Sequence, residues 1–90
     1  GHWFFDPHRH LVYQGLHKIE LTSSEVKLLQ LLCDCRPEAL SRDQLAKNMG
    51  GINERSIDVQ IIRLRQKIEQ DPKKPVLIKT IRHQGYALAE

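Results

Sequence analysis

One 13-residue segment, residues 55–67, combines long cationic and amide side chains with branched apolar ones at helical spacing. At about 100° per residue, Ile57, Ile61, Leu64 and Ile68 form an apolar stripe on one side of the expected helix. The opposite side collects Arg55, Val59, Ile62, Arg63 and Gln66, with Ser56 and Lys67 on its flank. Arginine can donate two hydrogen bonds to a guanine edge, glutamine can read adenine, and an apolar group can contact the thymine methyl. This mixture suits a helix that lies in the major groove of DNA.

Two of these outward-facing residues are unusual for a helix that merely faces water. Such a helix more typically carries Glu and Lys pairs than Val59 and Ile62. The alternative is that both side chains pack beneath a neighbouring loop. Arg65 projects toward Asp58 and Glu69, so we expect it to form a structural ion pair in preference to a DNA contact.

The positive charge of the chain is concentrated near its C-terminal end. The 90 residues carry a net charge of +3, from 14 Lys and Arg against 11 Asp and Glu. Residues 55–82 hold eight basic and three acidic residues, a net +5, whereas the others hold six and eight, a net −2. This asymmetry is typical of proteins that bind polyanions. Lys79 and Arg82 bracket the tip of an expected hairpin, where a long cation can enter a minor groove.

The elements that position these residues are indicated by local signals. A chain of 90 residues is enough for one modest core, so we interpret residues 1–90 as a single domain, with Gly1-His2 as a tag remnant. Capping boxes at Thr22 and Ser41 and a cap at Asn53 predict helices over about 23–35, 42–49 and 54–70. Short β-rich runs predict strands near residues 3–5, 11–13 and 18–21, and a terminal hairpin over 76–81 and 86–88. The fold class is therefore α+β, with an N-terminal antiparallel sheet, three helices and a C-terminal hairpin.

Several other classes of function find little support. We expect no enzyme, because Asp34, Glu38 and Asp43 show no sign of forming a buried acid–base pair, and we expect no cofactor. Cys33 and Cys35 are interpreted as free thiols of a reducing cytosol. No run is long and apolar enough for a membrane span, and no signal peptide opens the chain. Four of the five histidines are interpreted as exposed loop residues, with a metal site as the weaker alternative; these four are His2, His8, His10 and His17.

Four stretches together carry a resemblance to a known family. They are Leu21-Thr22-x-x-Glu25, Leu40-Ser41-Arg42-Asp43-x-Leu45, Arg55-Ser56-Ile57-Asp58-Val59-Gln60-Ile61-x-Arg63-Leu64-Arg65-x-Lys67, and Thr80-Ile81-Arg82-x-x-Gly85-Tyr86. Over residues 3–89 the chain resembles the winged helix-turn-helix DNA-binding effector domain of the OmpR/PhoB family of bacterial two-component response regulators.

The resemblance implies roles for particular residues. The third helix would enter the major groove, with Val59 and Arg63 reading bases, and the hairpin wing would enter the minor groove through Arg82. Thr80 would contact the DNA backbone, Arg42 and Arg55 would face phosphates, and the family also uses Arg65 near DNA. The full set of candidate DNA-binding residues is Arg42, Arg55, Ser56, Val59, Ile62, Arg63, Arg65, Gln66, Lys67, Lys79, Thr80, Arg82 and His83.

The chain departs from the family pattern at three places. His83 stands where the wing usually has glycine, so we expect either a reshaped tip or a contact of His83 with DNA. The segment 49–54 is shorter than the usual loop between the second and third helices, which commonly carries polymerase contacts. The N-terminal sheet is also one strand short.

The function expected from these features is sequence-specific binding of double-stranded DNA in the cytoplasm, for transcription regulation in a two-component system. Paired copies would occupy direct-repeat half-sites, and RNA polymerase is a further candidate partner. A receiver domain is expected from the family alone and is not present in residues 1–90. The alternative is a winged-helix module that binds protein, in which Val59 and Ile62 would be interface anchors. Salt dependence separates the two, because DNA binding releases counterions.

Overall fold

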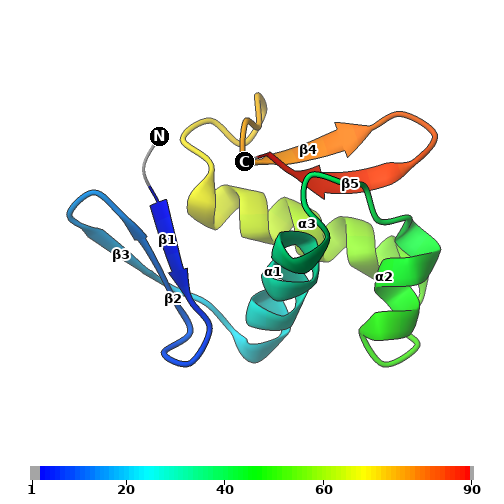
Figure 1. Ribbon diagram of the computed structural model, residues 1–90, viewed down its shortest axis with the longest axis horizontal. Coiled ribbons are helices and arrows are strands. Elements are labelled where there is room, and N and C mark those ends of the chain that lie inside the picture. Colours follow the sequence, from blue (N-terminus) through cyan, green and yellow to red (C-terminus); the bar gives the residue numbers. More distant parts are fainter. Residues whose placement is uncertain (1–2, 90) are drawn as a thin grey trace.

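The computed structural model describes residues 3–89, in which three strands precede three helices and two final strands (Figure 1). The proposed tag remnant, Gly1-His2, lies outside the described residues. The strands are β1 (Trp3–Asp6), β2 (Leu11–Gln14), β3 (His17–Glu20), β4 (Ile78–Ile81) and β5 (Gly85–Leu88). The helices are α1 (Ser23–Cys35), α2 (Arg42–Asn48) and α3 (Glu54–Ile68). Every element predicted from the sequence is confirmed, with differences of a few residues at the ends.

The N-terminal sheet is antiparallel, in the order β1-β2-β3. Its register places Phe5, Val12 and Ile19 side by side on the face that packs against the core. Phe4 and Tyr13 are partners on the opposite face, where Phe4 is exposed. This alternation follows from the period of two along each strand.

All three helix starts have the caps that the sequence predicts. The Thr22 hydroxyl accepts the Glu25 N–H at 3.2 Å, and the Glu25 carboxylate accepts the Thr22 N–H at 2.8 Å. Ser41 and Gln44 repeat the arrangement at 3.0 and 2.9 Å. Asn53 accepts the N–H of Ser56 at 2.8 Å. Each cap satisfies N–H groups that have no partner within the helix.

Helix α3 ends two residues earlier than predicted, at the point where Glu69 contacts the segment that leads into β4. The helix ends at Ile68, and Glu69 adopts an extended conformation. The buried Glu69 carboxylate accepts the N–H groups of Val76, Leu77 and Ile78 at 2.8–3.1 Å. These bonds hold the start of the hairpin against the helix end, so β4 also begins two residues later than predicted.

The core forms where α1 and α3 meet the two sheets. The predicted stripe of α3 is fully buried at Ile57, Ile61, Leu64 and Ile68. It packs with Leu28, Leu29 and Leu32 of α1 and with buried residues of the strands. The four α3 residues therefore fix which side of this helix remains free. Among the described residues, no helix has the length and apolar character needed to cross a membrane.

The hairpin β4–β5, which we call the wing, is attached to the segment that leads into α2. Leu40 and Tyr86 exchange two backbone hydrogen bonds, of 2.8 and 2.9 Å. Gly85 has a φ of +131°, and a Cβ atom there would collide with the Leu40 carbonyl group. Glycine is required at this position both for its conformation and for the close approach. The wing therefore cannot move freely relative to α2.

Candidate nucleic-acid interface

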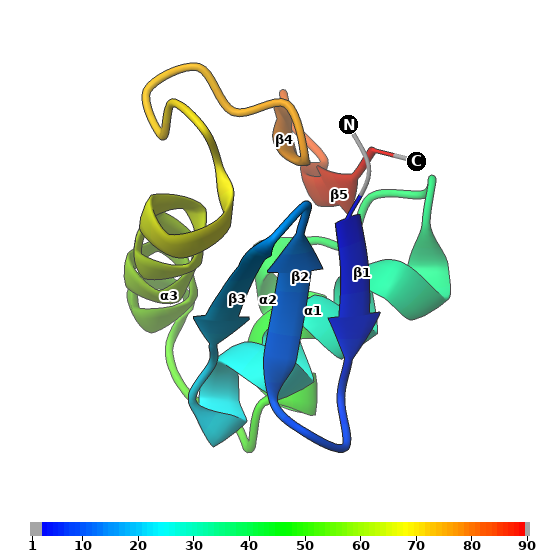
Figure 2. The same ribbon diagram turned by 90° about the vertical axis from the view of Figure 1, so that its left-hand side faces the viewer.

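The outer side of α3 is an exposed face of mixed cationic, amide and apolar character. Val59 is 40% exposed and Ile62 is 54% exposed, so the alternative that a neighbouring loop covers them is wrong. Figure 2 shows α3 at the left-hand edge of the molecule, beside β3. Five of the predicted DNA-binding residues are exposed together on this face: Arg55, Val59, Ile62, Arg63 and Gln66.

A polar hollow of about 370 Å³ lies over the first half of α3. Its lining includes Asn53, Arg55, Ser56 and Arg63, together with Gln60. The Oε1 atom of Gln60 is buried and lacks a hydrogen-bond partner among the described residues. Gln60 was not among the residues predicted from the sequence. Gln60 lies beside the buried apolar stripe of α3, so the helical pattern did not place it on the exposed face.

The Arg42 guanidinium is paired with two acidic side chains of α3. Its Nε and Nη2 atoms donate to the two carboxylate oxygens of Asp58 at 3.0 and 2.7 Å. Its Nη1 atom also lies 3.4 Å from a carboxylate oxygen of Glu54. This paired geometry joins α2 to α3, and a planar guanidinium suits it well. The Arg42 side chain is still 44% exposed, so its predicted phosphate contact remains a prediction.

The ion pair expected for Arg65 is wrong. Its Nε and Nη2 atoms donate to the Ile78 carbonyl at 3.1 and 2.7 Å, and Nη2 donates to the Thr80 hydroxyl at 2.9 Å. The expected acidic partners are occupied elsewhere, Asp58 by Arg42 and Glu69 by the N–H groups that precede β4. Arg65 therefore has a structural role, but its partner is the wing.

Tyr86 completes this connection between α3 and the wing. Its hydroxyl donates to Asp58 Oδ1 at 2.8 Å, and the Arg65 guanidinium lies over its ring, 5.5 Å from the centroid. Burial, together with the hydrogen bond to Asp58 and the charge of that carboxylate, raises the pKa of Tyr86 to about 12. Asp58 thus accepts hydrogen bonds from both α2 and β5.

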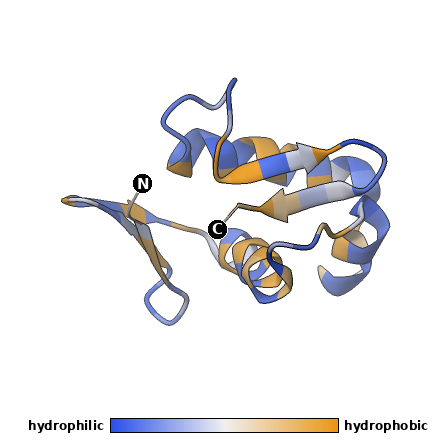
Figure 3. Ribbon diagram, turned by 45° about the horizontal axis from the view of Figure 1, so that its top comes forward, coloured by the Kyte–Doolittle hydropathy of each residue, from blue (hydrophilic) through white to orange (hydrophobic). Residues whose placement is uncertain are grey.

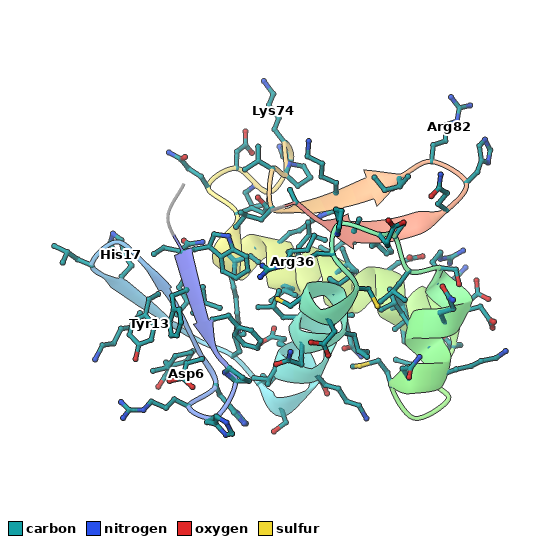
Figure 4. All side chains as sticks on the ribbon, in the orientation of Figure 1. Asp6, Tyr13, His17, Arg36, Lys74 and Arg82 are labelled. Atoms are coloured by element: carbon teal, nitrogen blue, oxygen red, sulfur yellow. The ribbon has the colours of Figure 1, made fainter. Side chains whose placement is uncertain are left out.

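The wing tip presents exposed cationic side chains at the end of the hairpin. Arg82 extends away from the body of the molecule in Figure 4, and Lys79 and His83 are also exposed. The Gln84 N–H donates to the Ile81 carbonyl at 2.9 Å, which closes a tight turn. His83 has a φ of +65° in this turn, a conformation that glycine adopts more readily. The tip thus remains a tight turn, with a histidine in the left-handed region.

Lys67 does not join the other predicted residues on the exposed face. Its Nζ atom pairs with Glu25 Oε1 at 2.6 Å and donates to the Glu20 carbonyl at 3.1 Å, which ties α3 to the start of α1. Burial alone would raise the pKa of Glu25, but the hydrogen bonds from Lys67 and from the Thr22 N–H outweigh it and hold the pKa below its usual value. The aliphatic stem of Lys67 lies on the predicted flank of α3, whereas its ammonium group bonds to Glu25 and to the Glu20 carbonyl.

The remaining reactive side chains lie away from this face. Cys33 and Cys35 are free thiols of α1, and burial raises the pKa of Cys33. Within residues 3–89, no three histidine, cysteine or acidic side chains gather closely enough to hold a metal ion.

The chain is similar to known regulatory proteins. A family model described as "Transcriptional regulatory protein, C terminal" matches residues 16–88. The chain is 34% identical to protein PetR of Rhodobacter capsulatus over 94 aligned residues, which cover 94% of this chain and 40% of PetR. It is 42% identical to the regulatory protein VirG of Agrobacterium tumefaciens over 82 residues, covering 87% of this chain and 31% of VirG. The chain thus spans less than half the length of these relatives.

A solved structure is similar over almost the whole chain. It is the DNA-binding domain of RstA from Klebsiella pneumoniae in complex with the RstA box. The two chains superpose with a TM-score of 0.87 and are 33% identical, over 99% of this chain and 92% of the other.

Proposed function

This chain belongs to the family of transcriptional regulatory protein C-terminal domains, and from that premise we propose that it binds a specific duplex DNA sequence through α3 and the wing. The family is one of DNA-binding regulators, not of enzymes, and the fold is a winged helix. The observation that carries the proposal is the exposed face of α3, where Val59 and Ile62 remain open to solvent between arginines. A helix with this face can offer both hydrogen bonds and apolar contacts to base edges.

The proposed geometry assigns different tasks to different parts of the interface. In the major groove, α3 reads bases through Arg63 and Val59, and Ile62 and Gln66 extend the contact. Arg55 and Ser56 at the start of α3 face phosphates, as does the exposed part of Arg42. On the wing, Lys79 and Thr80 face the DNA backbone, and Arg82 and His83 approach the minor groove, whose negative potential attracts cations.

The wider setting is proposed from the longer relatives. We propose that the chain is the effector domain of a cytoplasmic response regulator, in which a receiver domain accounts for the additional length seen in PetR and VirG. One reading helix covers few base pairs, so two copies on direct-repeat half-sites would supply the needed affinity. RNA polymerase is a further proposed partner, although residues 49–53 leave only a short loop between α2 and α3.

The test is a selection of bound sequences from random duplex DNA, followed by a salt titration on the enriched site. We expect a defined sequence motif. The logarithm of the binding constant should fall linearly with the logarithm of the salt concentration, with a slope of about −0.9 for each phosphate contacted. Absence of enrichment would contradict the proposal. An interaction of the α3 face with protein that barely responds to salt would instead support the protein-binding alternative.

A further inference from the structure

The loop between α3 and β4 contains a fixed turn that carries two lysines. The Lys74 N–H donates to the Asp71 carbonyl at 2.9 Å, and the Lys73 N–H donates to Asp71 Oδ1 at 3.1 Å. A few residues later, the Glu69 carboxylate holds the N–H groups that lead into β4. Because both its centre and its end are hydrogen-bonded, this turn is presented in a defined position. It is exposed and hydrophilic, as is the wing tip (Figure 3).

A groove of about 520 Å³ separates this turn from the second half of α3. Ile62, Arg65 and Gln66 line one wall, and Asp71, Pro72 and Lys73 line the other. Ile62 and Gln66 also belong to the exposed face proposed to contact DNA, so the groove is continuous with that face. Within the described part of the chain, Lys73 has no ion-pair partner within 4.0 Å.

The dimensions of α3 indicate what should occupy the groove. A helix of 15 residues is about 22 Å long, whereas the major groove of B-DNA is about 12 Å wide. A helix that crosses the major groove of DNA therefore extends to the sugar–phosphate backbone at the edge of the major groove. The cationic and apolar groups of this groove suit that backbone, since phosphate pairs with a lysine and deoxyribose packs against apolar carbon.

We propose that this groove is a further DNA contact, which holds the sugar–phosphate backbone at the C-terminal edge of the α3 footprint. Lys73 pairs with a phosphate there, and Ile62 and Pro72 pack against deoxyribose. This inference rests on the proposed function, because it assumes that α3 lies in the major groove. Asp71 does not offset Lys73 through a direct ion pair, and its carboxylate is used by the Lys73 backbone N–H.

The neighbouring lysine offers a matched control. Lys74 lies outside the lining of the groove and extends away from the body of the molecule (Figure 4). Lys73→Gln and Lys74→Gln remove the same charge from the same exposed turn. Near 0.1 M salt, we expect Lys73→Gln to weaken binding to the selected duplex roughly three- to tenfold and to reduce the salt slope by about 0.9. Lys74→Gln should change affinity less than twofold.

A second measurement locates the contact on the DNA. Single phosphates of the selected duplex are replaced one at a time by neutral methylphosphonates, and affinities are measured for the unmodified protein and for Lys73→Gln. We expect one edge position at which the replacement weakens binding of the unmodified protein but not of Lys73→Gln. Equal losses for Lys73→Gln and Lys74→Gln, with no such position, would overturn this inference while DNA binding stands. Failure of the unmodified protein to bind any duplex would overturn the proposed function itself.

Discussion

The Tyr86 hydroxyl of the wing donates a 2.8 Å hydrogen bond to Asp58 of α3, the same carboxylate that accepts two hydrogen bonds from Arg42 of α2. One acidic side chain therefore links all three elements of the proposed interface. Arg65 strengthens the connection, because it bonds to β4 and lies over the Tyr86 ring. The position of the wing relative to α3 is thus fixed by these side-chain contacts.

The phenol of Tyr86 should lose its proton at a higher pH than an ordinary tyrosine, and this should affect stability at high pH. Its pKa of about 12 in the folded protein exceeds the ordinary value of about 10. The folded state therefore keeps this proton where the unfolded state releases it, so stability present below about pH 10 is lost as the pH rises toward 12. Absorbance titration of the phenolate should show a step near pH 12.

Tyr86→Phe is the matched variant for this titration. It keeps the ring beneath Arg65 but removes the hydroxyl, so the late phenolate step should disappear. We expect the free energy of unfolding near neutral pH to fall by about 1–2 kcal/mol, because Asp58 loses one donor. A late step that persists in Tyr86→Phe would mean that Tyr86 is not its source.

Replacement of His83 by glycine should stabilise the fold. His83 has a φ of +65°, which costs a residue with a Cβ atom about 1–2 kcal/mol, whereas glycine also loses more entropy on folding. We expect a net gain of up to about 1 kcal/mol in urea unfolding. Gln84→Gly is the control, because Gln84 does not have a positive φ and should lose stability. A loss of stability in His83→Gly would show that the histidine side chain makes a compensating contact.

Arg63→Ala should reduce selectivity as well as affinity. An arginine that reads a base contributes about 1–3 kcal/mol of discrimination, so the variant should lose this amount on the selected site and tolerate changes at one or two positions. Arg55→Ala, which is proposed to face a phosphate, should weaken all duplexes alike and reduce the salt slope by about 0.9. Competition binding with specific and random duplexes distinguishes them. Equal losses of Arg63→Ala on both duplexes would contradict base reading.

The contribution of Arg82 should depend on the DNA that flanks the site. Runs of A·T narrow the minor groove and deepen its negative potential, which favours an inserted arginine. Arg82→Ala should therefore lose more affinity on a site flanked by A·T runs than on one flanked by G·C. Lys79→Ala, farther from the tip, should lose similar affinity on both. The minor-groove assignment fails if Arg82→Ala behaves in the same way as Lys79→Ala.

Local interactions explain why so much of the fold could be predicted. Each helix cap joins residues three positions apart, so Thr22 with Glu25, and Ser41 with Gln44, are readable directly from the sequence. The apolar stripe of α3 likewise repeats at helical spacing, and its burial determines which residues remain exposed. The predicted exposure of Val59 and Ile62 followed from that geometry.

The partners of the charged side chains depend on contacts between distant parts of the chain. Asp58 and Glu69 were nearer to Arg65 in sequence, but Arg65 bonds to residues 13 and 15 positions away. Lys67 similarly reaches Glu25, 42 positions away. A long flexible side chain can reach many partners, and its choice depends on which acceptors the assembled fold leaves free.

The sequence by itself determined the elements, their caps, the buried side of α3 and the family. Only the tertiary structure decided how the wing is held against α3, where α3 ends, and which cations remain available to a ligand. The physical reason is the range of the interactions: caps and apolar periodicity act within a few residues, whereas the bonds at Asp58, Arg65 and Glu69 form once the chain has brought separate segments together.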